Sequence, residues 1–188
     1  MGSPIVGSEN AEKEAVLETA RLMLVAARTA PKTAGIDDVL TSIVMGEEKE
    51  IIADKMDEIA NERKMESFRR DARNVRDSDT VVLIGIRGGK SIGSNCGSCG
   101  YGSCKEFDET EKELGKDFIG PTCVFKALDL GIALGSAVKT ASMLNVDNRI
   151  MYRVGTAALR LGFLPGATVI IGIPLSARGK SIYFDRSK

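Results

Sequence analysis

The chain has 188 residues, of which 43% are hydrophobic, and Lys+Arg and Asp+Glu both number 26, so its formal net charge is zero. This length and composition suffice for one hydrophobic core, and we expect a single α/β domain over residues 1–188. The balanced charge, without a long run of Lys or Arg, argues against a nucleic-acid-binding protein. The absence of His excludes His-ligated metals and a histidine general base.

No apolar stretch reaches the roughly 20 residues that a membrane-spanning helix needs. Residues 1–14 lack the basic and apolar regions of a signal peptide. We therefore expect a cytoplasmic protein without a membrane partner. The reducing conditions of the cytoplasm argue against structural disulfides.

The first half of the chain alternates between predicted helices and strands. Apolar residues recur at three- and four-residue steps in residues 9–30 and again in 47–70, which predicts two amphipathic helices. A short strand is predicted over residues 38–45. Residues 80–86 are β-branched and nearly all apolar, which is typical of a strand buried on both faces.

The second half begins with an irregular segment, residues 87–104, which is rich in Gly and Ser. Helices are predicted over residues 125–144 and 149–161. A buried strand is predicted over 167–173 and an edge strand over 181–184. This order of helices and strands predicts an α/β fold.

Two charged features are predicted to be ordinary surface structure. The run at residues 106–116 is predicted to be a solvated helix. Asp38, which stands at the start of a predicted strand, is interpreted as a turn or cap residue.

All four cysteines fall between residues 96 and 123, with the spacing C-x2-C-x4-C-x18-C. Three close ligands and one distant ligand are typical of an iron–sulfur site, because a 4Fe–4S cubane needs four thiolates that approach from different directions. We therefore predict a 4Fe–4S cluster on Cys96, Cys99, Cys104 and Cys123. Residues 87–124 would form an inserted, cysteine-rich cluster-binding loop, which we call the cysteine loop.

Zinc is the alternative metal. Four-cysteine zinc sites usually contain two short C-x2–4-C pairs, whereas 18 residues separate the second pair here. Inert thiols are the remaining alternative. Cysteines that serve only as small apolar residues are expected in a core and not in a polar, Gly-rich loop.

The segment CGSCGYGSCKEF (96–107), together with GPTC (120–123), resembles the four-cysteine module of the Rnf-complex ferredoxin subunit and of corrinoid iron–sulfur proteins. The resemblance implies a 4Fe–4S cluster. The whole chain also resembles the uncharacterised ferredoxin-domain protein family of anaerobic bacteria and archaea. That resemblance indicates the cofactor and leaves the biochemical role open.

Four further segments resemble the FMN-dependent nitroreductase family, namely AARTAPKT (26–33), LGIAL (130–134), AALRLG (157–162) and VIIGIP (169–174). The resemblance implies a three-layer α/β nitroreductase-like fold. It also implies an intertwined homodimer with FMN at the interface between the two chains.

The chain departs from that family where the flavin phosphate is bound. The N-terminal R-R-S-x-R stretch is missing, and Lys32 stands where the family has Ser. A chain that keeps the fold without flavin is therefore the alternative. By position and charge, the candidate phosphate contacts are Lys32, Thr33, Arg178 and Lys180, and solvated surface is the other interpretation of these residues.

The leading hypothesis is a cytoplasmic iron–sulfur redox protein that transfers single electrons through a 4Fe–4S cluster to FMN in a nitroreductase-like dimer. It would act as a flavin-linked oxidoreductase that works with a redox partner protein, and no catalytic residue is assigned. One alternative is a non-catalytic electron carrier or cluster-based sensor without flavin. The other is a zinc-stabilised interaction module.

Overall fold

The structure, a computed structural model, describes residues 5–184. In chain order its elements are α1 (Ser8–Thr29), the 3-10 helix η1 (Thr33–Gly35), β1 (Val39–Val44), α2 (Gly46–Arg63), α3 (Glu66–Asp77), β2 (Thr80–Ile86), α4 (Cys104–Glu109), β3 (Glu113–Leu114), β4 (Ile119–Gly120), α5 (Val124–Met143), β5 (Asp147–Asn148), α6 (Tyr152–Arg160) and β6 (Val169–Ser176).

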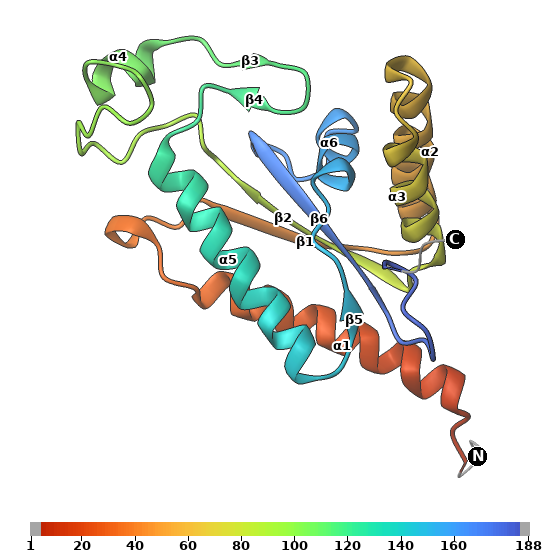
Figure 1. Cartoon of the computed structure of the whole chain (residues 1–188). Helices are drawn as coiled ribbons and strands as arrows, with labels where there is room; N and C mark the ends of the chain where they lie inside the picture. The colour runs from red at the N-terminus through yellow and green to blue at the C-terminus, as the bar shows by residue number, and fades with distance from the viewer. Residues whose placement is uncertain (1–4, 185–188) are drawn as a thin grey trace.

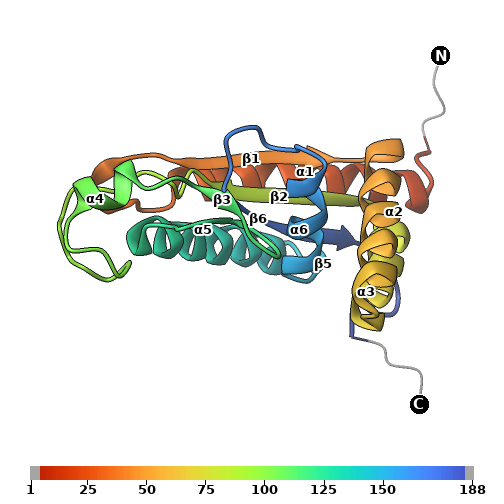
Figure 2. The same ribbon diagram turned by 90° about the horizontal axis from the view of Figure 1, so that it is seen from above.

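A four-stranded antiparallel sheet in the order β1-β2-β6-β5 forms the middle of three layers. Helices α1 and α5 pack on one face of the sheet, and α2, α3 and α6 pack on the other (Figures 1 and 2). The predicted three-layer α/β class is therefore confirmed. No helix within residues 5–184 is long and apolar enough to cross a bilayer.

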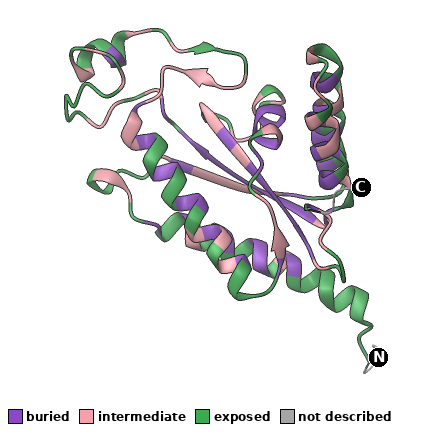
Figure 3. Ribbon diagram, in the orientation of Figure 1, coloured by how far each residue is buried: buried purple, intermediate pink, exposed green. Residues whose placement is uncertain are grey.

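Strand β2 lies at the centre of the molecule, and all 7 of its residues are buried (Figure 3). Side chains alternate between the two faces of a strand. Val81 and Leu83 accordingly join the core under α2, α3 and α6, whereas Val82, Ile84 and Ile86 join the core under α1 and α5. The prediction of a strand buried on both faces is confirmed.

The strand register defines two ends of the sheet. At one end Ile86 pairs with Val39 of β1 and with Val169 of β6. The cysteine loop leaves β2 here, and we call this the loop end. At the opposite end, the far end, Val81 pairs with Val44.

The prediction of one helix over residues 47–70 is wrong. Lys64 adopts a left-handed conformation with a φ of 54°, and the Met65 N–H group donates to the Ala60 carbonyl over 3.0 Å. This Schellman-type ending separates α2 from α3. Both helices contribute to the same core, so the apolar pattern continues across the break and conceals it.

The predicted edge strand over residues 181–184 is also wrong, because residues 182–184 form a turn. The side chains of Asn74 and Arg149 donate to the carbonyls of Ile182 and Tyr183 over 2.6 and 2.9 Å. These two side-chain donors satisfy carbonyls that would pair with a neighbouring strand if residues 181–184 were an edge strand.

The solvated helix predicted over residues 106–116 is only partly present, since α4 ends at Glu109 and the β3-β4 hairpin follows. The Lys112 ammonium group donates to the carbonyls of Phe107 and Thr110, both over 2.5 Å. This contact satisfies carbonyls at the end of α4 and turns the chain toward the hairpin.

Gly155 provides a test of the packing between α6 and β6. A Cβ atom at this position would lie 1.6 Å from the Ile170 carbonyl oxygen, which is backbone and cannot rotate away. We expect Gly155→Ala to lower the free energy of unfolding by about 3 kcal/mol or more. Urea unfolding followed by circular dichroism measures this loss.

Gly179→Ala is the matched control, because a Cβ at Gly179 meets nothing within 4 Å. Its unfolding free energy should stay within about 0.5 kcal/mol of the wild type. Equal unfolding midpoints for the two variants would contradict the close helix–strand contact.

Candidate metal centre

The four cysteines lie on the cysteine loop, which projects from the loop end of the sheet and contains α4 and the β3-β4 hairpin (Figure 1). Cys96 is exposed, Cys99 and Cys104 are half-buried, Cys123 is buried, and all four thiols are free. Three of the predicted ligands therefore come from the irregular segment and the start of α4. The fourth stands immediately before α5.

The side chains do not converge into a coordination group in this structure. Within residues 5–184, no three His, Cys, Asp or Glu side chains lie close enough together to hold a metal ion. The donor set nevertheless consists of four thiols with no His in the chain. Such a set fits a soft, thiolate-binding metal or an iron–sulfur cluster.

Asn95 and Cys104 bind each other through a reciprocal pair of contacts. The Cys104 N–H group donates to Asn95 Oδ1 over 2.8 Å, and the Asn95 N–H group donates to Cys104 Sγ over 3.2 Å. Asn95 has a φ of 51°, a conformation that Asn adopts more readily than most residues. These two contacts fix the position of the Cys104 sulfur relative to the backbone of Asn95.

The sequence around Cys104 fixes the start of α4. Ser103 is the N-cap residue and accepts a hydrogen bond from the Glu106 N–H group over 3.1 Å. The Glu106 carboxylate reaches back and accepts from the Gly102 N–H group over 3.0 Å. This arrangement is close to a capping box, which explains why the helix begins at the third cysteine.

A tight turn separates the first cysteine from the third, and Cys99 lies inside it. Gly97 and Gly100 have φ values of 71° and 88°, and the Gly100 N–H group donates to the Gly97 carbonyl over 3.0 Å. Only glycine adopts this conformation without strain. The backbone N–H group of Ser98, assisted by the Ser94 side chain, holds the pKa of the Cys96 thiol below its usual value.

Cys123 is tied to the sheet. Its N–H group donates to the Gly88 carbonyl over 2.9 Å, and the Gly88 N–H group donates to Thr168 Oγ1, also over 2.9 Å. A Cβ at Gly88 would lie 2.5 Å from the Thr122 side chain and 2.9 Å from the Thr168 hydroxyl. Gly88 is therefore required where the two ends of the cysteine loop meet.

The cysteine loop is also held by contacts of its own. Tyr101 packs edge-on against Phe107 with 5.6 Å between the ring centroids, and Phe107 is buried. Arg63 of α2 forms an ion pair of 2.5 Å with Asp117, and Arg160 of α6 donates to the Lys116 carbonyl over 3.4 Å. The turn of the hairpin is thereby fixed to the layer of α2 and α6.

Two of the predicted phosphate contacts, Lys32 and Thr33, lie between α1 and β1 at the loop end, where their own chain engages them. The Lys32 side chain is 7% exposed and donates to the carbonyls of Ala27 and Ala30 over 3.0 and 2.9 Å. The Thr33 N–H and hydroxyl groups donate to Asp129 Oδ1 over 2.9 and 2.8 Å. Lys32 thus caps α1, and Thr33 joins the end of α1 to α5.

The other two predicted phosphate contacts, Arg178 and Lys180, are exposed and follow β6 at the far end. Arg178 pairs with Asp79 over 2.8 Å and borders a cavity of about 270 Å³ that the buried Ser176 also lines. Within one chain, the structure therefore places the four candidate residues as two pairs at opposite ends of the sheet.

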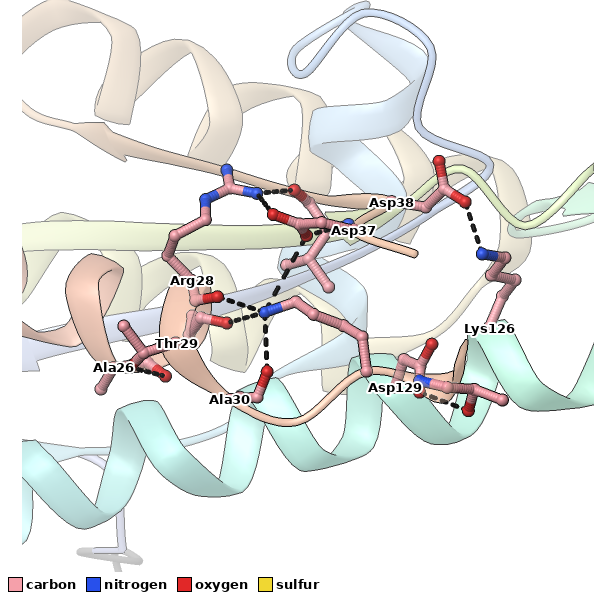
Figure 4. A network of polar contacts seen from close by, with 12 residues as sticks. Ala26, Arg28, Thr29, Ala30, Asp37, Asp38, Lys126 and Asp129 are labelled. Atoms are coloured by element: carbon pink, nitrogen blue, oxygen red, sulfur yellow. Dashed lines mark hydrogen bonds and ion pairs between the residues drawn. The ribbon is translucent and has the colours of Figure 1, made fainter. Parts of the chain in front are cut away.

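A buried polar network joins α5 to the start of β1 (Figure 4). Lys126 is 1% exposed, and its Nζ lies 2.5 Å from Asp38 Oδ2. Asp38, which was predicted to be a turn or cap residue, is therefore the counter-ion of a buried lysine. Nearby, partial burial acts to raise the pKa of Asp37. The hydrogen bonds from Arg28 and the Val39 N–H group, together with the positive charges of Arg28 and Lys32, outweigh burial, so the pKa lies below its usual value.

Sequence reasoning missed this network, although a signal was present. The buried face of α5 consists of small and apolar residues except for Lys126 and Asp129, which are three positions apart. Charged side chains on the apolar face of a helix need partners inside the protein. The sequence alone does not say which distant residues supply those partners.

The family described as "Uncharacterized protein containing a ferredoxin domain (DUF2148)" matches residues 119–186, which include Cys123 and none of the other three cysteines. An uncharacterized protein of Archaeoglobus fulgidus is 48% identical over 183 residues, which cover 97% of this chain and 98% of the relative. The chain belongs to this ferredoxin-domain family.

Solved structures show that the ferredoxin-domain protein has a nitroreductase fold. Nitroreductase CinD from Lactococcus lactis, in complex with nicotinic acid, has a TM-score of 0.58 at 12% identity over 100% of this chain and 87% of that one. A nitroreductase with bound FMN from Desulfitobacterium hafniense has a TM-score of 0.56 at 16% identity, over 87% of this chain and 79% of that one. At these identities the likeness concerns the fold alone, and it confirms the predicted nitroreductase-like fold.

Some of these structural relatives are considerably longer than the ferredoxin-domain protein. Nitroreductase A from Vibrio parahaemolyticus has a TM-score of 0.51 at 11% identity, and the alignment covers 96% of this chain. The chain spans only 62% of the length of that relative.

Lys32 tests the arrangement at the end of α1. We expect Lys32→Met to lower the free energy of unfolding by about 2 kcal/mol, because the carbonyls that it caps lose a charged donor. Lys105→Met is the control, since the Lys105 side chain is 84% exposed and its ion pair with Glu109 lies on the surface. A Lys32→Met variant as stable as the Lys105→Met variant in thermal unfolding would contradict the capping role.

Proposed function

We propose that the ferredoxin-domain protein binds a 4Fe–4S cluster through Cys96, Cys99, Cys104 and Cys123 and transfers single electrons. The observation that carries the proposal is the 3.2 Å contact in which the Asn95 N–H group points at Cys104 Sγ. Hydrogen bonds from backbone N–H groups to ligand sulfurs are a principal means of setting the potential of iron–sulfur sites. The ferredoxin domain in the description of the family supports the same proposal.

The protein's own groups prepare the thiolates. The hydrogen bond from the Ser98 backbone lowers the pKa of Cys96 below its usual value, which eases the loss of its proton to a metal. Cys123 is the N-cap of α5, a helix of 20 residues, and the free N–H groups of its first turn favour negative charge at this position. When bound, a 4Fe–4S cluster accepts and releases one electron at a time.

We further propose that FMN binds as a second redox group and that a redox partner protein supplies the electrons. The nitroreductase fold and the bound FMN of the D. hafniense relative support the flavin. Because the two pairs of candidate residues lie at opposite ends of one sheet, a single phosphate reaches only one pair within a chain. We assign the phosphate to Arg178 and Lys180, because both residues are exposed whereas the Lys32 side chain is buried at the end of α1.

The exposed face of α5 supports a homodimer. Its exposed residues include a single charged residue, and the others are Ala127, Leu128, Gly131, Ile132, Gly135, Ser142 and Met143. A Cβ added at Gly131 or Gly135 would meet nothing within 4 Å. A helix face that is apolar and flat is suited to close contact with another helix, and we propose that α5 of a second copy covers it.

The dimer is tested by a charge placed on this face. We expect Ile132→Asp to convert a two-chain species into single chains, because a carboxylate at the centre of the interface would be buried without a partner. Leu114→Asp is the control, since Leu114 is 59% exposed on the β3-β4 hairpin, compared with 45% for Ile132. Light scattering after gel filtration measures both masses, and a wild-type mass of one chain would refute the dimer.

The cluster is tested on protein purified without oxygen. We expect about four irons per chain and a broad absorption that dithionite bleaches. Replacing any one of the four cysteines by Ala should remove most of the iron. Tyr101→Phe is the control, because it keeps the ring that packs on Phe107 and should keep the iron.

The same samples distinguish the alternatives. Stoichiometric zinc without iron would refute the redox function and leave a zinc-stabilised interaction module. Iron without flavin would leave an electron carrier or cluster-based sensor. Iron together with FMN would support the flavin-linked oxidoreductase.

A further inference from the structure

We propose that the buried ion pair of Lys126 and Asp38 sets the reduction potential of the centre that Cys123 helps to hold. The positive charge of Lys126 favours the reduced state of the centre, and the negative charge of Asp38 partly offsets the effect of Lys126. Both act as positioning and charge-supplying residues and not as ligands. This inference rests on the proposed 4Fe–4S site.

A closed ring of contacts places this pair at the base of the cysteine loop. The Asp38 carbonyl accepts from the Arg87 N–H group over 3.0 Å, and the adjacent Gly88 carbonyl accepts from the Cys123 N–H group over 2.9 Å. Lys126 follows Cys123 by three residues and closes the ring through the Asp38 carboxylate. The residues that fix the fourth ligand therefore also fix a buried positive charge.

Packing does not explain why a lysine occupies this position. Lys126 is 1% exposed, and within residues 5–184 its Nζ lies within ion-pair distance of Asp38 but makes no hydrogen bond of good geometry. Lys49, a second buried lysine, instead donates to the carbonyls of Arg76 and Ser78 over 2.8 and 2.7 Å. An isolated buried ion pair is often no more stabilising than an apolar pair of the same volume, which points to a role for the charge itself.

The direction of the effect follows from charge alone. One added electron makes the centre more negative by one unit, and no bond forms or breaks. A nearby fixed cation stabilises that state, as does the N-terminus of α5. The Asp38 side chain is 24% exposed, so water screens its charge more than that of Lys126, and the pair acts on the centre as a partial positive charge.

The experiment is a redox titration of the anaerobically purified protein with dithionite and mediator dyes, followed by absorbance and electron paramagnetic resonance. We expect Lys126→Met to lower the ratio of reduced to oxidised centre about tenfold at a fixed potential, which equals about 59 mV for one electron. Asp38→Asn should shift the ratio in the opposite direction. Lys49→Met, which also removes a buried lysine but near the far end, should leave the potential unchanged.

Each outcome decides the question. A Lys126→Met protein with full iron content and the wild-type potential would overturn the proposal and leave a purely structural ion pair. If the Lys126→Met variant loses its iron, the Asp38→Asn variant decides the question, because it leaves Lys126 in place. An upward shift of its reduction potential supports the proposal, and an unchanged reduction potential overturns it. Failure of the underlying function is visible separately, as a wild-type protein that binds no iron.

Discussion

The hydrogen bond from the Cys123 N–H group to the Gly88 carbonyl closes the cysteine loop onto the sheet, and the geometry of the candidate site depends on it. Closing a long loop carries an entropic cost that rises only slowly with its length, so a short, well-anchored junction suffices. Thr168, the residue immediately before β6, supplies that anchor by accepting a hydrogen bond from the Gly88 N–H group. The junction lies where β2 ends, and β2 is the most deeply buried strand of the fold.

Sequence patterns predicted those parts of the fold that burial determines. Helix α1 was predicted because its apolar residues recur at helical steps, and strand β2 because its residues are β-branched and nearly all apolar. The break between α2 and α3 was not predictable, because Lys64 takes a left-handed conformation without being Gly or Asn. The turn at residues 182–184 was missed because Asn74 and Arg149, which hold it, are distant in the sequence.

The candidate site likewise contains features that a local sequence pattern suggests and features that depend on the tertiary structure. The four cysteines follow a recognisable spacing in the sequence, so the sequence alone suggests a ligand set, and that set stays a prediction. The pairing of Lys126 with Asp38 depends on how α5 lies beside β1, which no local pattern contains. The phosphate contacts fall between these cases: their segments resemble a family pattern, but the strand register separates Lys32 and Thr33 from Arg178 and Lys180.

Helix α5 connects the proposed features. Its N-cap is Cys123, its first turn buries Lys126, and its outer face carries Gly131 and Gly135 with free space beside them. In the proposed dimer, the same helix would begin at the cysteine loop and contribute its outer face to the interface. A rigid helix packed against α1 and the sheet holds its ligand and its charges in fixed positions. In the proposed redox site, surroundings that do not rearrange when the charge of the centre changes would allow electron transfer with little reorganisation, and the packing of α5 would supply that rigidity.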